Sequence, residues 1–210
     1  MPVEKLQNEV VGARFNKEID LADESIRYEQ IGNVIYLMVT PSFDHEAIIA
    51  KIMTQFNVYL NGKTCIALGS NIGLNLEQFV PILKDNSSFQ EYFKQKDEAK
   101  KERAFLLPDI SVQCEPDGKF KSTSRGYPKL PKFVAEVYSP STGEDDLGLK
   151  KDIYELIGVP EYWVIYDRQN VSVFILKDGK YKRERYRVME DEDILEVPVS
   201  IFPDLIIRFD

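Results

Sequence analysis

Two acidic residues occupy apolar, strand-like runs in which a buried strand has no need of a charge. Asp109 lies in the run at 105–114, and Glu136 lies in the run at 132–139. A carboxylate among apolar neighbours is costly unless it is paired or bound to a cation. A divalent ion shared by the two acids would remove that cost, and such an ion can activate water and polarise a phosphoryl group. The pattern predicts a metal site that cleaves phosphodiester bonds.

A helix-like segment after the second run supplies basic residues. Asp146 and Lys150 are four residues apart and share a helix face, and Lys151 is the competing lysine. A lysine beside the acids could orient or deprotonate the nucleophile, or neutralise charge in the transition state. The residues alone leave a plainer interpretation open. In that interpretation Asp109 caps a turn, Glu136 pairs with a surface lysine, and the helical pair is an ordinary surface contact.

Length and composition favour a soluble, cytoplasmic protein with one main domain. With 210 residues and 43% hydrophobic content, the chain can bury a sizeable core. Its first residues lack the apolar core of a signal peptide, and no apolar run approaches the ~20 residues of a membrane helix. The net charge of −8 argues against a protein that coats nucleic acid non-specifically. A nuclease stays open, because basic segments at 94–103, 119–132 and 177–187 are either solvated faces or phosphate contacts.

The two cysteines, Cys65 and Cys114, both lie in strand-like runs. Because the chain shows no secretory signal, we expect buried free thiols rather than a disulfide. Two cysteines and the single histidine, His45, are also too few to suggest a structural zinc site.

Hydrophobic periodicity and turn residues predict a mixed order of strands and helices. The expected elements are strands at 26–29 and 34–40, a helix capped by Ser42 or Asp44 that runs to residue 60, strands at 64–70 and 72–76, a hairpin at 171–176 and 180–187, and strands at 194–197 and 205–209. Residues 1–24 are expected to form an arm, and residues 25–210 a single domain. Within it, 77–104 would be a charged helical insertion that projects from the sheet, and the C-terminal strands a β-meander that extends it.

Several motifs of the chain match a known family. The segments are 108–112, 131–142, 146–154 and 158–163, with further matches at 28–36, 41–45 and 171–181. The most specific are Glu-Val-Tyr-Ser-Pro-Ser-Thr from residue 136 and Gly-Val-Pro-Glu-Tyr-Trp from residue 158. Over most of its length the chain resembles the Uma-two type of restriction endonuclease, a former domain of unknown function in the PD-(D/E)XK nuclease superfamily.

The resemblance implies the restriction-endonuclease-like fold, an α/β (α+β) architecture with a mixed central β-sheet flanked by helices. It also implies a metal-dependent phosphodiesterase in which Asp109 and Glu136 bind Mg²⁺, with Mn²⁺ as the alternative ion. The choice between DNA and RNA as the substrate stays open at this point. The superfamily lysine normally lies two residues after the glutamate, where this chain has Tyr138. The family pattern instead has a lysine on the following helix. Lys150 matches it, and Asp146 would orient it.

Two further residues at matching positions, His45 and Glu29, are supporting candidates for the site. Tyr162 and Trp163 are expected to pack in the core behind it, with stacking on a base as the alternative. The leading hypothesis is a Mg²⁺-dependent endonuclease acting on DNA. The alternatives are a catalytically weak or inactive binding or regulatory protein, and a structural domain that forms oligomers. Because nucleases that cut both strands often pair their sites, a homodimer is one expectation for the assembly.

Overall fold

The computed structural model describes residues 10–11, 27–38, 40–94, 103–121, 126–139, 146–188 and 194–210. Nearly all of the expected arm at 1–24, and residues 95–102 of the expected charged helix, lie outside these ranges. Among the described residues, no helix combines the length and apolarity needed to cross a membrane.

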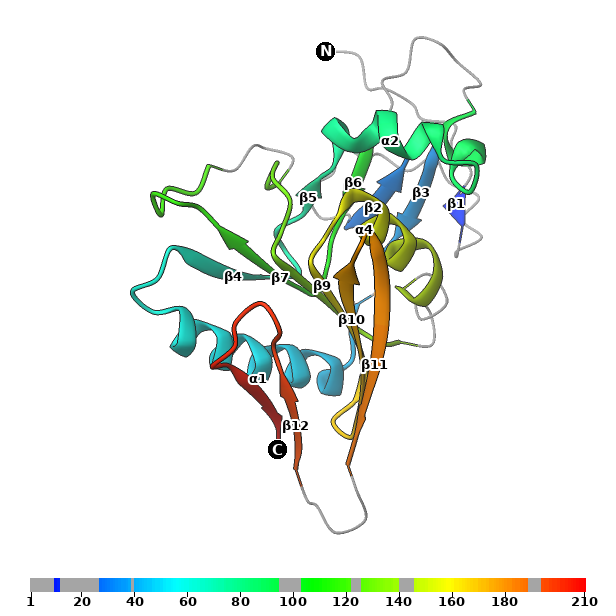
Figure 1. The fold of residues 1–210 in the computed structure, drawn as a ribbon. Helices are drawn as coiled ribbons and strands as arrows, with labels where there is room; N and C mark the ends of the chain where they lie inside the picture. Colours follow the sequence, from blue (N-terminus) through cyan, green and yellow to red (C-terminus); the bar gives the residue numbers. More distant parts are fainter. Residues whose placement is uncertain are drawn as a thin grey trace.

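The centre of the fold is a six-stranded sheet with the order β11-β10-β9-β8-β7-β4 (Figure 1). Its strands are β4 (Cys65–Gly69), β7 (Ile110–Cys114), β8 (Phe133–Val137), β9 (Glu161–Asp167), β10 (Asn170–Lys177) and β11 (Lys180–Arg187). β8 and β9 run parallel and the other neighbours run antiparallel, so the sheet is mixed. The β10–β11 hairpin turns at Asp178 and Gly179, which both have positive φ, as expected for this Asp-Gly turn.

One face of this sheet is covered by α1 (Phe43–Leu60), which begins and ends where the sequence predicts. The Ser42 hydroxyl accepts a hydrogen bond from the backbone N–H of His45 and caps the first turn. Ile52 and Phe56 belong to the apolar stripe that packs on Phe133 and its neighbours. The position of α1 brings its first turn to the edge of the sheet where β7 begins and β8 ends.

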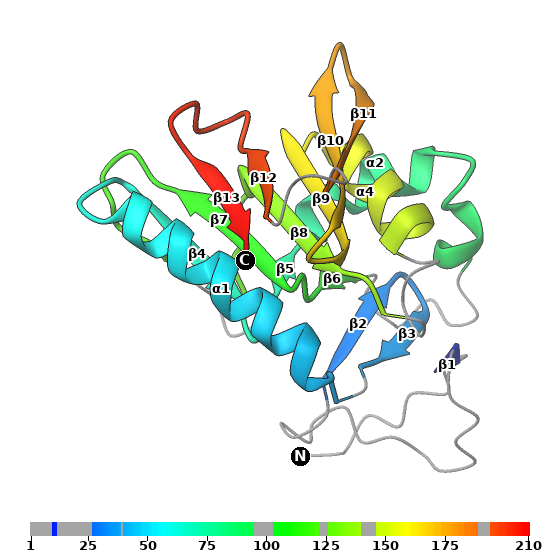
Figure 2. The same cartoon turned by 90° about the horizontal axis from the view of Figure 1, so that it is seen from below.

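The last two strands, β12 (Leu195–Pro198) and β13 (Ile206–Phe209), form a separate two-stranded sheet. They lie beside α1 (Figure 2). There the side-chain amide of Gln55 donates a hydrogen bond to the carbonyl of Arg208 and accepts one from its backbone N–H. The predicted meander is therefore correct for β10–β11 and wrong for this pair. Their inward side chains, such as Val197 and Ile207, fill the core beside α1, whereas the charged edge strand β11 offers little apolar surface for continuing the sheet.

The opposite face packs on a five-stranded sheet and a set of short helices. The sheet has the order β1-β3-β2-β6-β5, with β1 (Val10–Val11), β2 (Tyr28–Ile31), β3 (Val34–Leu37), β5 (Leu74–Asn75) and β6 (Ala104–Leu106). The helical elements are η1 (Glu77–Phe79), α2 (Val80–Asp85), η2 (Gln90–Phe93), the π-helical turn η3 (Asp146–Lys150) and α4 (Lys151–Ile157). Gly32 forms the β2–β3 turn with φ +57, and an added Cβ would lie 2.0 Å from the carbonyl oxygen of Tyr92. The predicted fold class, with helical elements on both faces of a mixed sheet, is confirmed.

The segment expected to project from the sheet is in fact packed against it, as far as it is described. Val80, Leu83, Phe89 and Phe93 are buried in a second apolar core, on the face of the six-stranded sheet opposite α1. This core also includes Tyr162. The expectation of a projecting insertion was wrong for residues 77–94, because their charged residues alternate with apolar ones that reach this core.

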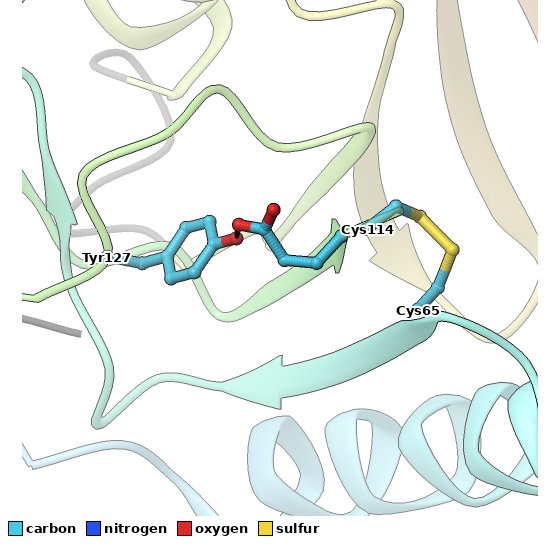
Figure 3. The surroundings of a disulfide bond; sticks show 4 residues. Cys65, Cys114 and Tyr127 are labelled. Atoms are coloured by element: carbon cyan, nitrogen blue, oxygen red, sulfur yellow. Dashed lines mark hydrogen bonds between the residues drawn. A yellow bond between two sulfur atoms is a disulfide. The ribbon is translucent and has the colours of Figure 1, made fainter. Parts of the chain in front are cut away.

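The expectation of free thiols was also wrong, because Cys65 and Cys114 form a disulfide (Figure 3). The two residues are direct partners in the antiparallel β4–β7 pair, and their Cα atoms are 4.0 Å apart. Such pairing brings two side chains within bonding distance. The sequence hides this register because the cysteines are separated by 49 positions.

Candidate active site

Asp109 and Glu136 lie side by side at the edge where β7 begins and β8 ends. β7 pairs antiparallel with β8, with Ile110 opposite Ala135, and this register brings the two acids together. Each carboxylate accepts a hydrogen bond from a backbone N–H of the opposite strand segment. The N–H of Asp109 donates to Oε2 of Glu136 at 3.3 Å, and the N–H of Val137 donates to Oδ2 of Asp109 at 2.8 Å. The two carboxylates predicted from the sequence are therefore fixed next to each other.

Lys150 reaches these acids from the end of η3. Its Nζ lies 3.2 Å from Oε1 of Glu136 and 3.1 Å from Oε1 of Glu29, and all three side chains are at most 5% exposed. Lys151, the competing lysine, instead pairs with Asp152. The side chain of Asp146 lies outside what the structure describes, so its predicted orienting role stays a prediction.

Glu29 comes from β2 and connects the second sheet to the site. Besides Lys150, it accepts a hydrogen bond of 2.8 Å from the backbone N–H of Leu107. Leu107 lies two residues before Asp109, between β6 and β7. Glu29 therefore holds both the lysine and the chain segment that delivers the aspartate.

His45 approaches from the first turn of α1. Its Nε2 lies 3.1 Å from Oδ2 of Asp109, with the two side chains 15% and 10% exposed. The Ser42 cap fixes the backbone of this turn, and thereby the direction from which the imidazole reaches the acid. The structure thus brings both supporting candidates, His45 and Glu29, to the predicted pair.

One contact was not predicted as part of the site. The hydroxyl of Tyr154, on α4, donates to Oε1 of Glu136 at 3.3 Å, the same oxygen that Lys150 contacts. The signal was present, because Tyr154 follows Lys150 by four residues and shares its helix face. Tyr162 and Trp163 are both fully buried in the two cores, which confirms their predicted packing role.

The acids open into a pocket of about 310 Å³, near the lower limit of about 300–1,000 Å³ for ligand sites. Asp109, Glu136, Lys150 and His45 line its inner part. The other lining residues include Arg27, Ser70, Tyr138, Ser139, Tyr166 and Asp167. Tyr138, at the position where the superfamily lysine is expected, is 37% exposed beside this pocket.

The donor set suits a hard cation, with one qualification from geometry. Asp109 and Glu136 offer carboxylate oxygens, which Mg²⁺ takes together with water and substrate oxygens. Within the described part of the chain, however, no three His, Cys, Asp or Glu side chains converge as ligands of one ion. Lys150 already contacts Glu136. A metal here would be held by the two acids and by oxygens that the protein does not supply.

The fold and the site together define a protein of the restriction-endonuclease-like class. Residues 15–207 match the model of the Uma2 family, described as "Putative restriction endonuclease". The chain belongs to this family, and at this coarse level it is a nuclease-family protein.

Two further proteins are similar to this chain, one in sequence and one in structure. An uncharacterized protein of Synechocystis, slr1290, is 24% identical over 185 residues, covering 87% of this chain and 84% of that protein. A crystal structure from Anabaena variabilis, described as a "putative nuclease belonging to DUF820", matches with a TM-score of 0.55 and 17% identity. That match covers 84% of this chain and 83% of the other and shows a shared fold.

Proposed function

We propose that this protein is a Mg²⁺-dependent endonuclease that hydrolyses phosphodiester bonds of DNA. The observation that carries the proposal is the contact of Lys150 with Glu136, beside Asp109, at the inner end of a pocket. Buried charges are costly, and a fold keeps them at a pocket most readily where they act on a ligand. Family membership supports the same class of reaction.

Asp109 and Glu136 would hold the metal ion. When bound, Mg²⁺ supplies Lewis-acid chemistry, which lowers the pKa of water and polarises a phosphoryl oxygen. The two hydrogen bonds from Asp109 N–H and Val137 N–H fix the directions in which the carboxylates point. The protein's contribution at this point is a rigid pair of oxygen ligands.

Lys150 would stabilise charge on the phosphate. In the proposed reaction the oxygen of water bonds to phosphorus, the bond from phosphorus to the leaving oxygen breaks, and that oxygen takes up a proton. An ammonium group aimed into the pocket lowers the free energy of the extra negative charge on the phosphoryl oxygens. Glu29 keeps Lys150 at this position through its 3.1 Å contact.

His45 would orient Asp109. Its Nε2 faces Oδ2 of Asp109, so the ring donates a hydrogen bond to the carboxylate. This bond and the one from Val137 N–H reach the same oxygen. Oδ2 is thereby held by two contacts, and we expect the other oxygen of Asp109 to take the metal ion.

One observation favours the second candidate, a nuclease fold that binds without useful catalysis. Lys150 contacts both Glu29 and Glu136, so the acids are neutralised in part without a metal. The absence of a three-residue ligand cluster among the described side chains points the same way. The two candidates differ in whether a divalent ion displaces this ammonium contact.

The test is cleavage of supercoiled plasmid and of single-stranded DNA by the purified protein with Mg²⁺, Mn²⁺ or EDTA. We expect cleavage with either metal and none with EDTA. Asp109→Asn should abolish it, because the amide loses the charge that binds the ion. Lys150→Gln should reduce it strongly, whereas Lys151→Gln, the same change at the neighbouring lysine, should leave it unchanged.

Circular dichroism of each variant separates loss of activity from loss of folding. Cleavage that survives in folded Asp109→Asn would overturn the site assignment. A wild-type protein that neither cleaves DNA nor binds Mn²⁺ would establish the second candidate instead.

A further inference from the structure

The sheet face that carries Glu136 continues across three more strands to the edge of the sheet. Glu136 on β8 lies opposite Val164 on β9, Val164 lies opposite Ser172 on β10, and Ser172 lies opposite Arg185 on β11. Directly paired residues point to the same face. With about 4.8 Å between strands, the distance from β8 to β11 is about 14 Å.

Two tyrosines stand on this face at the entrance of the pocket. Tyr138 follows Glu136 by two residues, and Tyr166 follows Val164 by two, so both share the face of the catalytic glutamate. Their ring centroids are 5.5 Å apart with an interplanar angle of 39°. Both line the pocket, and Tyr138 is 37% exposed. An aromatic surface is therefore available beside the acids.

Arg183, on the edge strand β11, reaches back across the sheet to the tyrosine pair. Its Nη2 donates to the hydroxyl of Tyr166 at 3.0 Å and to Oγ of Ser172 at 2.8 Å. Its guanidinium also lies over the ring of Phe174, 5.5 Å from the centroid. These contacts hold an exposed arginine across the strands, directly behind the tyrosine pair.

Alternation along β11 adds positive charge on this face. Arg183, Arg185 and Arg187 occupy every second position and are all exposed, whereas Lys182 and Glu184 point to the opposite face. The strip is unusual for this chain, whose net charge is −8. It lies on β11, the edge strand of the six-stranded sheet, and the contact of Arg183 with Tyr166 connects it to the pocket.

We propose that Tyr138, Tyr166, Arg183 and Arg185 form a binding path for single-stranded DNA that leads to the pocket. This inference rests on the proposed function. Bases would stack on the tyrosines and phosphates would contact the arginines, a combination that suits single strands of any sequence. A single strand fits better than a duplex, because Glu136 and Lys150 are at most 4% exposed within a small pocket. A phosphate must leave the regular duplex backbone to enter it.

The test is binding of a fluorescent oligothymidine to the full chain, followed by anisotropy in EDTA, so that no cleavage occurs. Arg185→Ala should weaken binding several-fold and reduce the salt slope by about 0.7, the value for one lost phosphate contact. Lys182→Ala removes the same charge from the opposite face of the same strand, and it should change neither quantity. Comparing these two variants separates the effect of the position of the positive charge from the effect of the net charge.

A second pair tests stacking. Tyr138→Ala should weaken oligothymidine binding about 5- to 150-fold, the range for loss of one stacked base. Tyr138→Phe keeps the ring and should bind as the wild type does. A blunt duplex of the same length should bind more weakly than the single strand.

Three results would each overturn the proposed binding path. They are equal effects of Arg185→Ala and Lys182→Ala, no effect of Tyr138→Ala, or tighter binding of the duplex than of the single strand. Failure of the proposed function looks different. In that case oligothymidine binding would follow the predicted pattern, while the wild type would cleave nothing with Mg²⁺ or Mn²⁺.

Discussion

Glu136 and Glu161 are both buried glutamates on neighbouring parallel strands, but they face opposite sides of the sheet. Glu161 accepts hydrogen bonds from Nε1 of Trp163 at 2.7 Å, Oγ of Ser200 at 2.6 Å and the N–H of Ile201 at 3.0 Å. These are all neutral donors, and the residue is fully buried. Its carboxylate ties the loop after β12 to the sheet.

Glu136 has a different kind of surroundings. Its contacts include the ammonium of Lys150 and the hydroxyl of Tyr154, and it borders a pocket. Two acids in apolar strand sequences thus serve different ends. A carboxylate enclosed by neutral donors is structural, whereas one that faces a cation and a pocket can exchange that cation for a ligand.

The same substitution at both residues gives the largest expected contrast. Glu136→Gln removes a proposed metal ligand, so DNA cleavage with Mg²⁺ should fall at least about 10³-fold, equivalent to about 4 kcal/mol. The free energy of unfolding should also fall, by about 1–3 kcal/mol, because one amide oxygen replaces two carboxylate oxygens that accept from Asp109 N–H, Lys150 and Tyr154. Cleavage rates and urea unfolding curves measure the two effects. Wild-type cleavage by Glu136→Gln would remove the distinction between the two glutamates.

Glu161→Gln should destabilise the protein without a loss of cleavage. An amide has only one oxygen to accept from three donors, so we expect a destabilisation of about 1–3 kcal/mol. Cleavage per folded molecule should equal that of the wild type, since the pocket is not lined by this residue. Urea unfolding and an assay normalised to the folded fraction test this. A cleavage defect at full folding would place Glu161 in the active site.

Glu115 sharpens the comparison, because it has a cationic partner but does not line the described pocket of the candidate site. Hydrogen bonds from Lys129 and then from the hydroxyl of Tyr127 hold the pKa of Glu115 below its ordinary value. A lowered folded-state pKa stabilises the protein above the unfolded value of about 4.5, and this contribution is lost as pH falls through the folded-state pKa. Glu115 directly follows Cys114 of the disulfide, at the end of β7 away from Asp109.

Glu115→Gln should therefore make the free energy of unfolding depend less on pH in the acidic range. We expect the smallest effect of the three here, because Lys129 is largely exposed and solvent screens the pair. Thermal unfolding between pH 3 and 7 measures it, with Lys119→Ala as a control in the same loop. If the stability of Glu115→Gln depended on acidic pH as that of the wild type does, the contact with Lys129 would not lower the pKa of this carboxylate.

Local pattern was enough to find some of these residues and not others. Asp109 and Glu136 stood out because acids interrupt apolar strands, and the fold class followed from the family motifs. Lys150 came from the family pattern, since spacing alone could not separate it from Lys151. Their different roles depend on which face of η3 and α4 meets the sheet, and that is a tertiary property.

Features set by long-range register could not be predicted. The pairing of Cys65 with Cys114 depends on how β4 aligns with β7, and the role of Glu161 depends on a loop 39 residues further along the chain. The hairpin β12–β13 was assigned to the central sheet because strand patterns do not specify a partner. In each case the missing information was which distant segment lies opposite.

The most direct test of the central claim is a crystal structure of the protein soaked in Mn²⁺, with anomalous scattering to locate the ion. We predict one peak within roughly 2.0–2.6 Å of carboxylate oxygens from both Asp109 and Glu136, the range for hard divalent cations, with Lys150 moved away from Glu136. Asp109→Asn crystals should lack the peak. An occupied ion elsewhere, or no ion and an intact contact between Lys150 and Glu136, would contradict the assignment of this site as a metal-dependent nuclease centre.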